Sequence, residues 1–125
     1  NKAEHDQKLM NIVFHFNPNL LKQLDCKWNF KTNFCMDEDN ICKSAEEEGP
    51  GAVHGITSAF FGNQHPTFKA LYETFKAYQW DKNLRDSLIG VFEDVVERTG
   101  KHDFCGKKSG FIVKVLEESC GRVKL

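Results

Sequence analysis

Five cysteines constrain the fold of this chain more than any other feature of its sequence. They stand at positions 26, 35, 42, 105 and 120 of 125 residues, and no two have the C-x-x-C spacing of a zinc site or a thioredoxin-type redox motif. Disulfides are therefore the better explanation. In a short chain they indicate an oxidising compartment, so we expect a secreted, extracellular protein.

The spacing limits which cysteines can pair. If residues 109–120 form a helix, Cys105 and Cys120 lie roughly 16 Å or more apart, whereas a disulfide needs Cα atoms within about 7 Å. Each should therefore reach back to positions 26, 35 or 42 and close a loop worth on the order of 4 kcal/mol. An odd count leaves one thiol over, which we assign to Cys26 as a buried small hydrophobe. Four cysteines then remain for the two bridges, and which of them pair stays open: Cys35, Cys42, Cys105 and Cys120.

Apolar residues recur at helical spacing along most of the chain, which predicts an all-α fold. Asn17 is expected to cap the second helix, Asp81 is expected to cap the fifth, and Gly100 should end that fifth helix. The expected helices are residues 9–16, a second helix opening at Pro18 and continuing through position 28, then 53–60, 66–78, 84–99 and 111–120.

The stretch "CKWNFKTNFC", residues 26–35, alternates aromatic and polar residues. As a strand it would need a partner, and no second alternating run exists, so we prefer a continuation of the second helix. That helix would be apolar on two faces. It is therefore either enclosed by the fold or leaves one aromatic row outside.

The composition predicts one soluble domain spanning residues 1–125. Hydrophobic residues make up 40% and charged residues 28%, and no stretch approaches the roughly 20 apolar residues that a membrane span requires. The polar start "NKAEHDQKLM" looks like a mature N-terminus. We expect a compact bundle of five to six short helices, stapled by two disulfides, with a core rich in the 11 phenylalanines.

Charge is concentrated in two segments. Residues 36–48 carry six acids against one lysine, and residues 98–108 set four basic residues against one acid. Such segments are typical of solvated loops, which in one interpretation face each other across the fold, but they are also the best candidates for contact with a protein partner. The candidate partner-binding residues are Asp37, Glu38, Asp39, Glu46, Glu47, Glu48, Arg98, Lys101, Lys107 and Lys108.

Nothing in the sequence indicates catalysis, a cofactor or a metal. His102 and Cys105 could form a thiolate-imidazole pair, but a disulfide would consume the sulfur, and no phosphate loop, zinc pair or nucleophile elbow is present. The acids of residues 37–48 do not match a calcium loop. A net charge of -1 argues against a nucleic-acid partner. We therefore expect a non-enzymatic protein.

The cysteines, the helix count and the length together resemble the anopheline salivary inhibitors of the alternative complement pathway. The resemblance implies a non-enzymatic inhibitor of a host plasma protein or protease cascade, such as complement or coagulation, which docks on a protein partner. The alternative is a carrier of a small apolar ligand, a fatty acid or an aromatic molecule, in a pocket lined by Trp28, Phe30 and Phe34.

Overall fold

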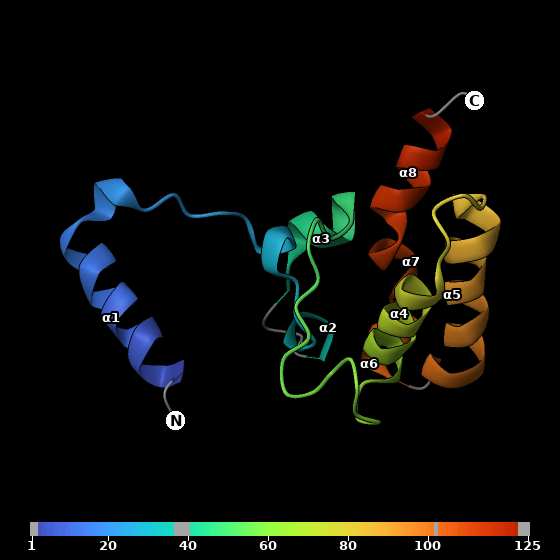
Figure 1. Ribbon diagram of the computed structural model, residues 1–125, viewed down its shortest axis with the longest axis horizontal. Coiled ribbons are helices and arrows are strands. Elements are labelled where there is room, and N and C mark those ends of the chain that lie inside the picture. The colour runs from blue at the N-terminus through green and yellow to red at the C-terminus, as the bar shows by residue number, and fades with distance from the viewer. Residues whose placement is uncertain (1–2, 37–40, 102, 123–125) are drawn as a thin grey trace.

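The computed structural model describes residues 3–36, 41–101 and 103–122, and the regular elements of these ranges are helices (Figure 1). The α-helices are α1 Ala3–Phe16, α2 Asn33–Met36, α3 Lys43–Glu48, α4 Pro66–Ala77, α5 Gly90–Val95, α6 Phe104–Lys107, α7 Ser109–Ile112 and α8 Lys114–Arg122. Within the described ranges no β-strand forms. None of the described helices is long and apolar enough to cross a membrane.

Two disulfides hold this helical fold together. Cys26 pairs with Cys42, and Cys35 pairs with Cys105 across 70 positions of sequence. The prediction of an all-α fold with short helices and two disulfides is confirmed. So is the prediction that Cys105 reaches back to the cysteines near the start of the chain.

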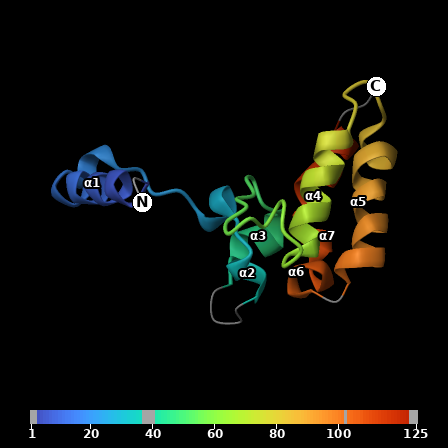
Figure 2. The same ribbon diagram turned by 60° about the horizontal axis from the view of Figure 1, so that its bottom comes forward.

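Helix α1 forms where the apolar spacing of residues 9–16 predicts it, and it stands apart from the other helices in both views (Figures 1 and 2). The second helix expected from Pro18 does not form. Only a 3₁₀ turn, Pro18–Leu20, follows, and Leu21 is already extended. Asn17 is no cap, because its side-chain amide donates to the Val13 carbonyl behind it and leaves the next turn without a side-chain acceptor.

The stretch 26–35 is neither a continuous helix nor a strand. It opens with the 3₁₀ turn Cys26–Asn29, crosses the fold at Phe30 and ends in α2. Phe30 forms an isolated parallel bridge with Val53, in which its N–H donates to the Ala52 carbonyl at 2.9 Å. This bridge places the Phe30 ring in the core. The predicted helix is wrong here, because long-range backbone hydrogen bonds replace the helical ones.

The segment between α3 and α4 contains no helix where one was expected at residues 53–60. Its backbone adopts positive φ at Thr57 (51°) and Ser58 (61°), values that a right-handed helix excludes. Gly49 ends α3 at φ 84°, and a side chain there would collide with the backbone of Val115. A glycine is therefore required where α3 meets α8.

The two longest predicted stripes of the second half are confirmed. Helix α4 begins at Pro66, and a continuous helical run follows the next connection as the π turn Arg85–Ile89, α5 and the π turn Val96–Gly100. The cap of that run is Asn83, whose side chain accepts from the Asp86 N–H at 3.1 Å, and not the predicted Asp81. The last helix is divided at Val113 into α7 and α8, with α8 ending at Arg122.

Two adjoining clusters form the core. Phe30 lies at the centre of the first, with its ring centroid 5.3 Å from that of Phe111 and 6.2 Å from that of Phe68. The second cluster lies between α4, α5 and α7, and Phe92 is its largest buried side chain. The predicted phenylalanine-rich interior is confirmed, since the three largest fully buried side chains are phenylalanines.

Candidate functional site

The two disulfides determine which of the described cysteines could act as free thiols. The prediction that Cys26 is a free thiol is wrong, because the 3₁₀ turn that opens at Cys26 brings its Cα to 5.9 Å from that of Cys42 at the start of α3. Cys105 is bonded to Cys35, so it offers no nucleophile to an imidazole. The side chain of Cys120 and residue His102 lie outside the described part of the structure.

Two of the acidic residues predicted to bind a partner, Glu46 and Glu48, form ion pairs within the fold. Glu46 forms an ion pair with Lys108 at 3.1 Å, and Glu48 forms one with Lys27. The contact between Glu46 and Lys108 joins the acidic segment to the basic one. At this ion pair the two charged segments meet, as one interpretation of the sequence proposed. Three of the predicted residues, Asp37, Glu38 and Asp39, lie outside the described residues.

The basic residues predicted to bind a partner are also held locally. Arg98 and Lys101 each pair with the acid four residues earlier on the same helical run. Lys107 lies 5.4 Å from the ring centroid of Phe104. These exposed contacts contribute little to stability, yet Arg98 and Lys101 each lie beside a carboxylate of opposite charge.

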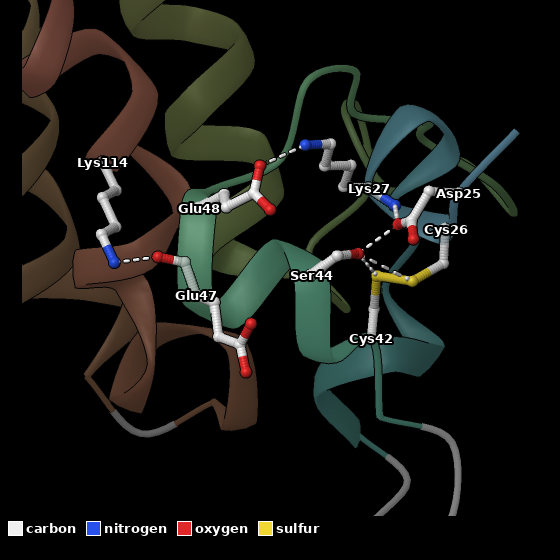
Figure 3. A network of polar contacts seen from close by, with 8 residues as sticks. All are labelled: Asp25, Cys26, Lys27, Cys42, Ser44, Glu47, Glu48 and Lys114. Carbon is white, nitrogen blue, oxygen red and sulfur yellow. Dashed lines mark hydrogen bonds and ion pairs between the residues drawn. A yellow bond between two sulfur atoms is a disulfide. The ribbon is translucent and has the colours of Figure 1, made fainter.

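A polar network fastens the turn at residues 25–27 to α3 (Figure 3). The Asp25 carboxylate accepts hydrogen bonds from the Lys27 N–H at 3.0 Å and from the Ser44 hydroxyl. Separately, Lys114 of α8 donates a hydrogen bond to the Glu47 carbonyl of α3. The Ser44 hydroxyl, followed by the Lys27 N–H, lowers the pKa of Asp25 below 3.8. The Asp25 side chain is therefore a carboxylate at neutral pH, suited to capping a turn and unsuited to donating a proton.

Among the described residues, one group of possible metal ligands comes together: Asp25, Cys26 and Cys42. The two sulfurs of this group are joined to each other in a disulfide, and a disulfide sulfur is not the thiolate that binds zinc. One exposed carboxylate remains, so this group has the chemistry of a structural cross-link.

An apolar cavity of about 350 Å³ lies between α4, the last two helices and the segment 50–53. Phe60, Tyr72 and Phe75 form its aromatic wall, and the rings of Phe60 and Tyr72 stack with centroids 5.6 Å apart. Leu71, Ile112, Val115 and Leu116 supply most of the remaining wall. The cavity can hold an apolar group, but Tyr72 is the one ionisable residue among those lining it, so acid-base chemistry has no pair of groups to use there.

The three aromatics predicted to line a pocket are not among the residues that line this cavity. Phe30 is 1% exposed in the core, Phe34 packs against it, and Trp28 is half exposed with its ring over Gly51. Sequence reasoning missed Phe60 and assigned Tyr72 to the core stripe of residues 66–78. The only signal in the sequence was the aromatic content of that stripe, which did not separate Tyr72 and Phe75 from core residues.

Comparison with known proteins places the chain beside enzymes. It is 38% identical to glucoside xylosyltransferase 1 of Danio rerio over 119 residues, which are 95% of this chain and 29% of that protein. It is 36% identical to glucoside xylosyltransferase 2 of Xenopus laevis over 114 residues, and 36% identical to glucoside xylosyltransferase 1 of Homo sapiens over 115 residues. Each of these two matches covers 91% of this chain and 26% of the relative.

No protein-family model and no solved structure matches the chain. The chain spans less than a third of the length of the curated relatives it matches.

These similarities correct the functional predictions made from the sequence. The resemblance to salivary complement inhibitors is wrong, because the proteins that match more than nine-tenths of the chain are glucoside xylosyltransferases. The expectations of a non-enzymatic docking inhibitor, and of a carrier for a small apolar ligand, are wrong for the same reason. Helix count, length and cysteine number describe only an overall architecture. Unrelated proteins share such architectures, so these features could not identify a relative.

Proposed function

We propose that this chain is one part of a glycosyltransferase that transfers xylose to a glucoside. The observation that carries the proposal is the 38% identity to a glucoside xylosyltransferase over 95% of the chain. Relatives from frog and human match 91% of the chain and carry names that state the same activity. An identity of this extent covers helices, loops and disulfide-bonded cysteines together, which favours common descent over a shared build.

Within such an enzyme the chain acts as a helical accessory unit. Sugar transfer needs a general base that accepts the proton of the acceptor hydroxyl, and hydrogen-bond donors that stabilise the charge on the leaving group. In the described residues, the apolar cavity beside Tyr72 lacks an acid-base pair and the one cluster of possible metal ligands contains a disulfide. We therefore assign the catalytic groups to the remaining 71% of the length of a protein like the Danio rerio relative, since the match covers 29% of it.

The unit we propose is secreted or lies in an oxidising compartment of the secretory pathway. Two of its cysteine pairs are bonded, and such bonds persist where the environment is oxidising. The bridge between Cys35 and Cys105 closes a 70-residue separation, worth about 4 kcal/mol in the chain-entropy account. The whole enzyme would depend on this stabilisation, because the core of the unit is small and lies in two clusters.

The test is a chimera in which this chain replaces the matching segment of the Danio rerio transferase. Purified chimera is incubated with an activated xylose donor and a glucoside acceptor, and xylosylated product is detected by mass spectrometry. We expect transfer above the level of a control enzyme that lacks the segment. A chimera that folds and binds the donor but transfers no xylose would overturn the proposal.

A further inference from the structure

The first 25 residues expose an apolar surface that the rest of the chain does not cover. From residue 6 to residue 25 every side chain is exposed except that of Phe14, which is half-buried. Large apolar residues stand out among them. The exposed fractions are 61% for Leu9, 56% for Ile12, 39% for Val13, 74% for Phe16, 64% for Leu20, 53% for Leu21 and 63% for Leu24.

The surface is ordered along one side of α1 and continues beyond it. Leu9, Ile12, Val13 and Phe16 recur at i, i+3, i+4 and i+7, which places them on one helix face. The chain then becomes extended at Leu21, with more exposed leucines before the body of the fold begins. We call the exposed apolar side chains of residues 9–24 the apolar strip.

Helix α1 gains no stability from its apolar face while that face stays exposed to water. A helix of 14 residues is marginal on its own in water, and most helical stability in proteins comes from packing of the apolar face. In Figures 1 and 2, α1 lies away from the other helices and is joined to them by the extended stretch. Among the residues whose burial the structure describes, eight of the fifteen exposed large apolar side chains fall between Leu9 and Leu24, so the exposure is concentrated there and is not a general property of the surface.

The length of the relatives indicates what covers the strip. At most six residues of this chain (125 minus 119) fall outside the match to the Danio rerio transferase, so the strip from Leu9 onward belongs to the matched segment. In that protein 71% of the length lies outside the match (100 minus 29). A surface tethered on the same chain reaches effective concentrations of the order of millimolar, far above those of a separate partner.

Charge argues against a lipid surface as the occupant. Helices that lie on membranes carry lysine and arginine on the polar face. Residues 3–24 contain two acids, Glu4 and Asp6, and two bases, Lys8 and Lys22, so their net charge is zero.

We infer that α1 and the extended stretch after it dock through the apolar strip onto the part of a longer transferase chain that lies outside these 125 residues. The inference rests on the proposed function, because that function supplies the longer chain. Docking fixes the helical unit to the catalytic portion at one end. The disulfide-stapled body then follows α1 as a rigid attachment.

Hydrogen exchange measured by mass spectrometry tests the docking in two samples, the isolated 125-residue chain and the chimera described above. In the isolated chain we expect α1 amides to exchange within about tenfold of the unfolded rate, as a marginal helix does. In the chimera the same amides should exchange at least a hundredfold more slowly. Equal exchange in both samples would overturn the inference.

Two variants of the chimera make the test specific to the apolar face. Phe16→Asp places a charge in the strip and should abolish the slow exchange of α1. Asn11→Asp adds the same charge about 140° away around the helix, at 100° per residue, and should leave the slow exchange unchanged. Loss of protection in both variants, or in neither, would contradict docking through this face.

The remaining outcomes also decide the question. A dimeric mass for the isolated chain with protected α1 amides would assign the strip to a second copy, and protection gained on anionic phosphatidylserine vesicles would assign it to lipid. An active chimera with unprotected α1 overturns the docking and keeps the proposed function. An inactive chimera with protected α1 does the reverse, and a chimera that does not fold overturns both.

Discussion

Replacing Gly106 with alanine should destabilise the fold, whereas the same change at Gly110 should not. A Cβ at Gly106 would lie 1.7 Å from the carbonyl oxygen of Gly100 and 2.9 Å from the hydroxyl oxygen of Thr67. The Gly100 oxygen is held in place, because it accepts a hydrogen bond from the Asp103 N–H at 3.0 Å. At Gly110 an added Cβ meets nothing within 4 Å.

The magnitude follows from these contacts. Overpacking costs about 1–3 kcal/mol, and a contact of 1.7 Å with backbone belongs at the upper end of that range. Alanine returns about 1 kcal/mol of helix propensity, so we expect a net loss of about 2 kcal/mol. With an unfolding entropy of about 2.1 cal/mol/K per residue, this chain should lose about 8 °C in Tm. Gly110→Ala should instead gain about 0.5–1 kcal/mol, or about 2–4 °C.

The assay is thermal unfolding followed by circular dichroism at a helical wavelength, with urea unfolding at 25 °C as the second measurement. Both variants are compared with the parent chain under oxidising conditions, so that the disulfides are equal in all three samples. If Gly106→Ala melts within about 4 °C of Gly110→Ala, the shift of a 1 kcal/mol change, the close packing of α6 on Gly100 is refuted.

Three further predictions concern the cross-link, the core and the polar network. Replacing Cys35 and Cys105 together by serine should cost about 4 kcal/mol in urea unfolding, and a cost under about 1 kcal/mol would contradict the pairing. Phe30→Ala should cost about 3–5 kcal/mol, since the ring is 1% exposed, and a surface-like loss of about 0.5 kcal/mol would show it is not core. Ser44→Ala should raise the pKa of Asp25 toward 3.8, because the lost hydroxyl is the largest cause of its lowering. Because the pKa of Asp25 is lower in the folded than in the unfolded chain, the stability that this carboxylate contributes is present above pH 3.8 and is lost as the pH falls through the folded pKa. An NMR titration of Asp25 that Ser44→Ala leaves unchanged would contradict this prediction.

Helices whose apolar stripe meets the core were predictable from the sequence. The stripe of α4 begins at Pro66 and buries Phe68, and the run after it ends at Gly100 as expected. In both cases local periodicity and tertiary packing favour the same structure, which is the condition under which a pattern is reliable. Asn83 replaces Asp81 as the cap because either side chain could accept the hydrogen bond, and only the path of the connection selects one.

Other elements depend on contacts that periodicity does not contain. Phe30 is placed by backbone hydrogen bonds to Ala52 and His54, more than twenty positions away, and these bonds interrupt the helix that residues 26–35 would otherwise favour. The disulfide partner of Cys26 is also distant in sequence, because Cys42 lies 16 positions later at the start of α3. The free-thiol prediction treated Cys26 as a local small hydrophobe, whereas its pairing is a long-range property.

The candidate site was predictable only in its charge. The acidic and basic segments were visible in the sequence, but Glu46 and Lys108 pair with each other, so charge that suggested an outside partner finds one inside the fold. The aromatic wall of the cavity was visible only as part of a helix stripe. Tyr72 and Phe75 could be distinguished from core residues only after the position of Phe60 was known.

The error about enzymatic activity has a general physical cause. Catalysis needs a few groups held in one place, and those groups can all lie on a different part of the protein from a stable, disulfide-stapled helical unit. The lack of a catalytic cluster therefore argues against an enzyme only when the whole active site is on the chain. Here the matched segment is 29% of the Danio rerio relative, and the apolar strip of residues 9–24 lacks a partner among the described residues. An exposed hydrophobic surface therefore supports the proposed docking more directly than the search for reactive side chains does, because burial is required of every folded segment and reactivity is required of very few.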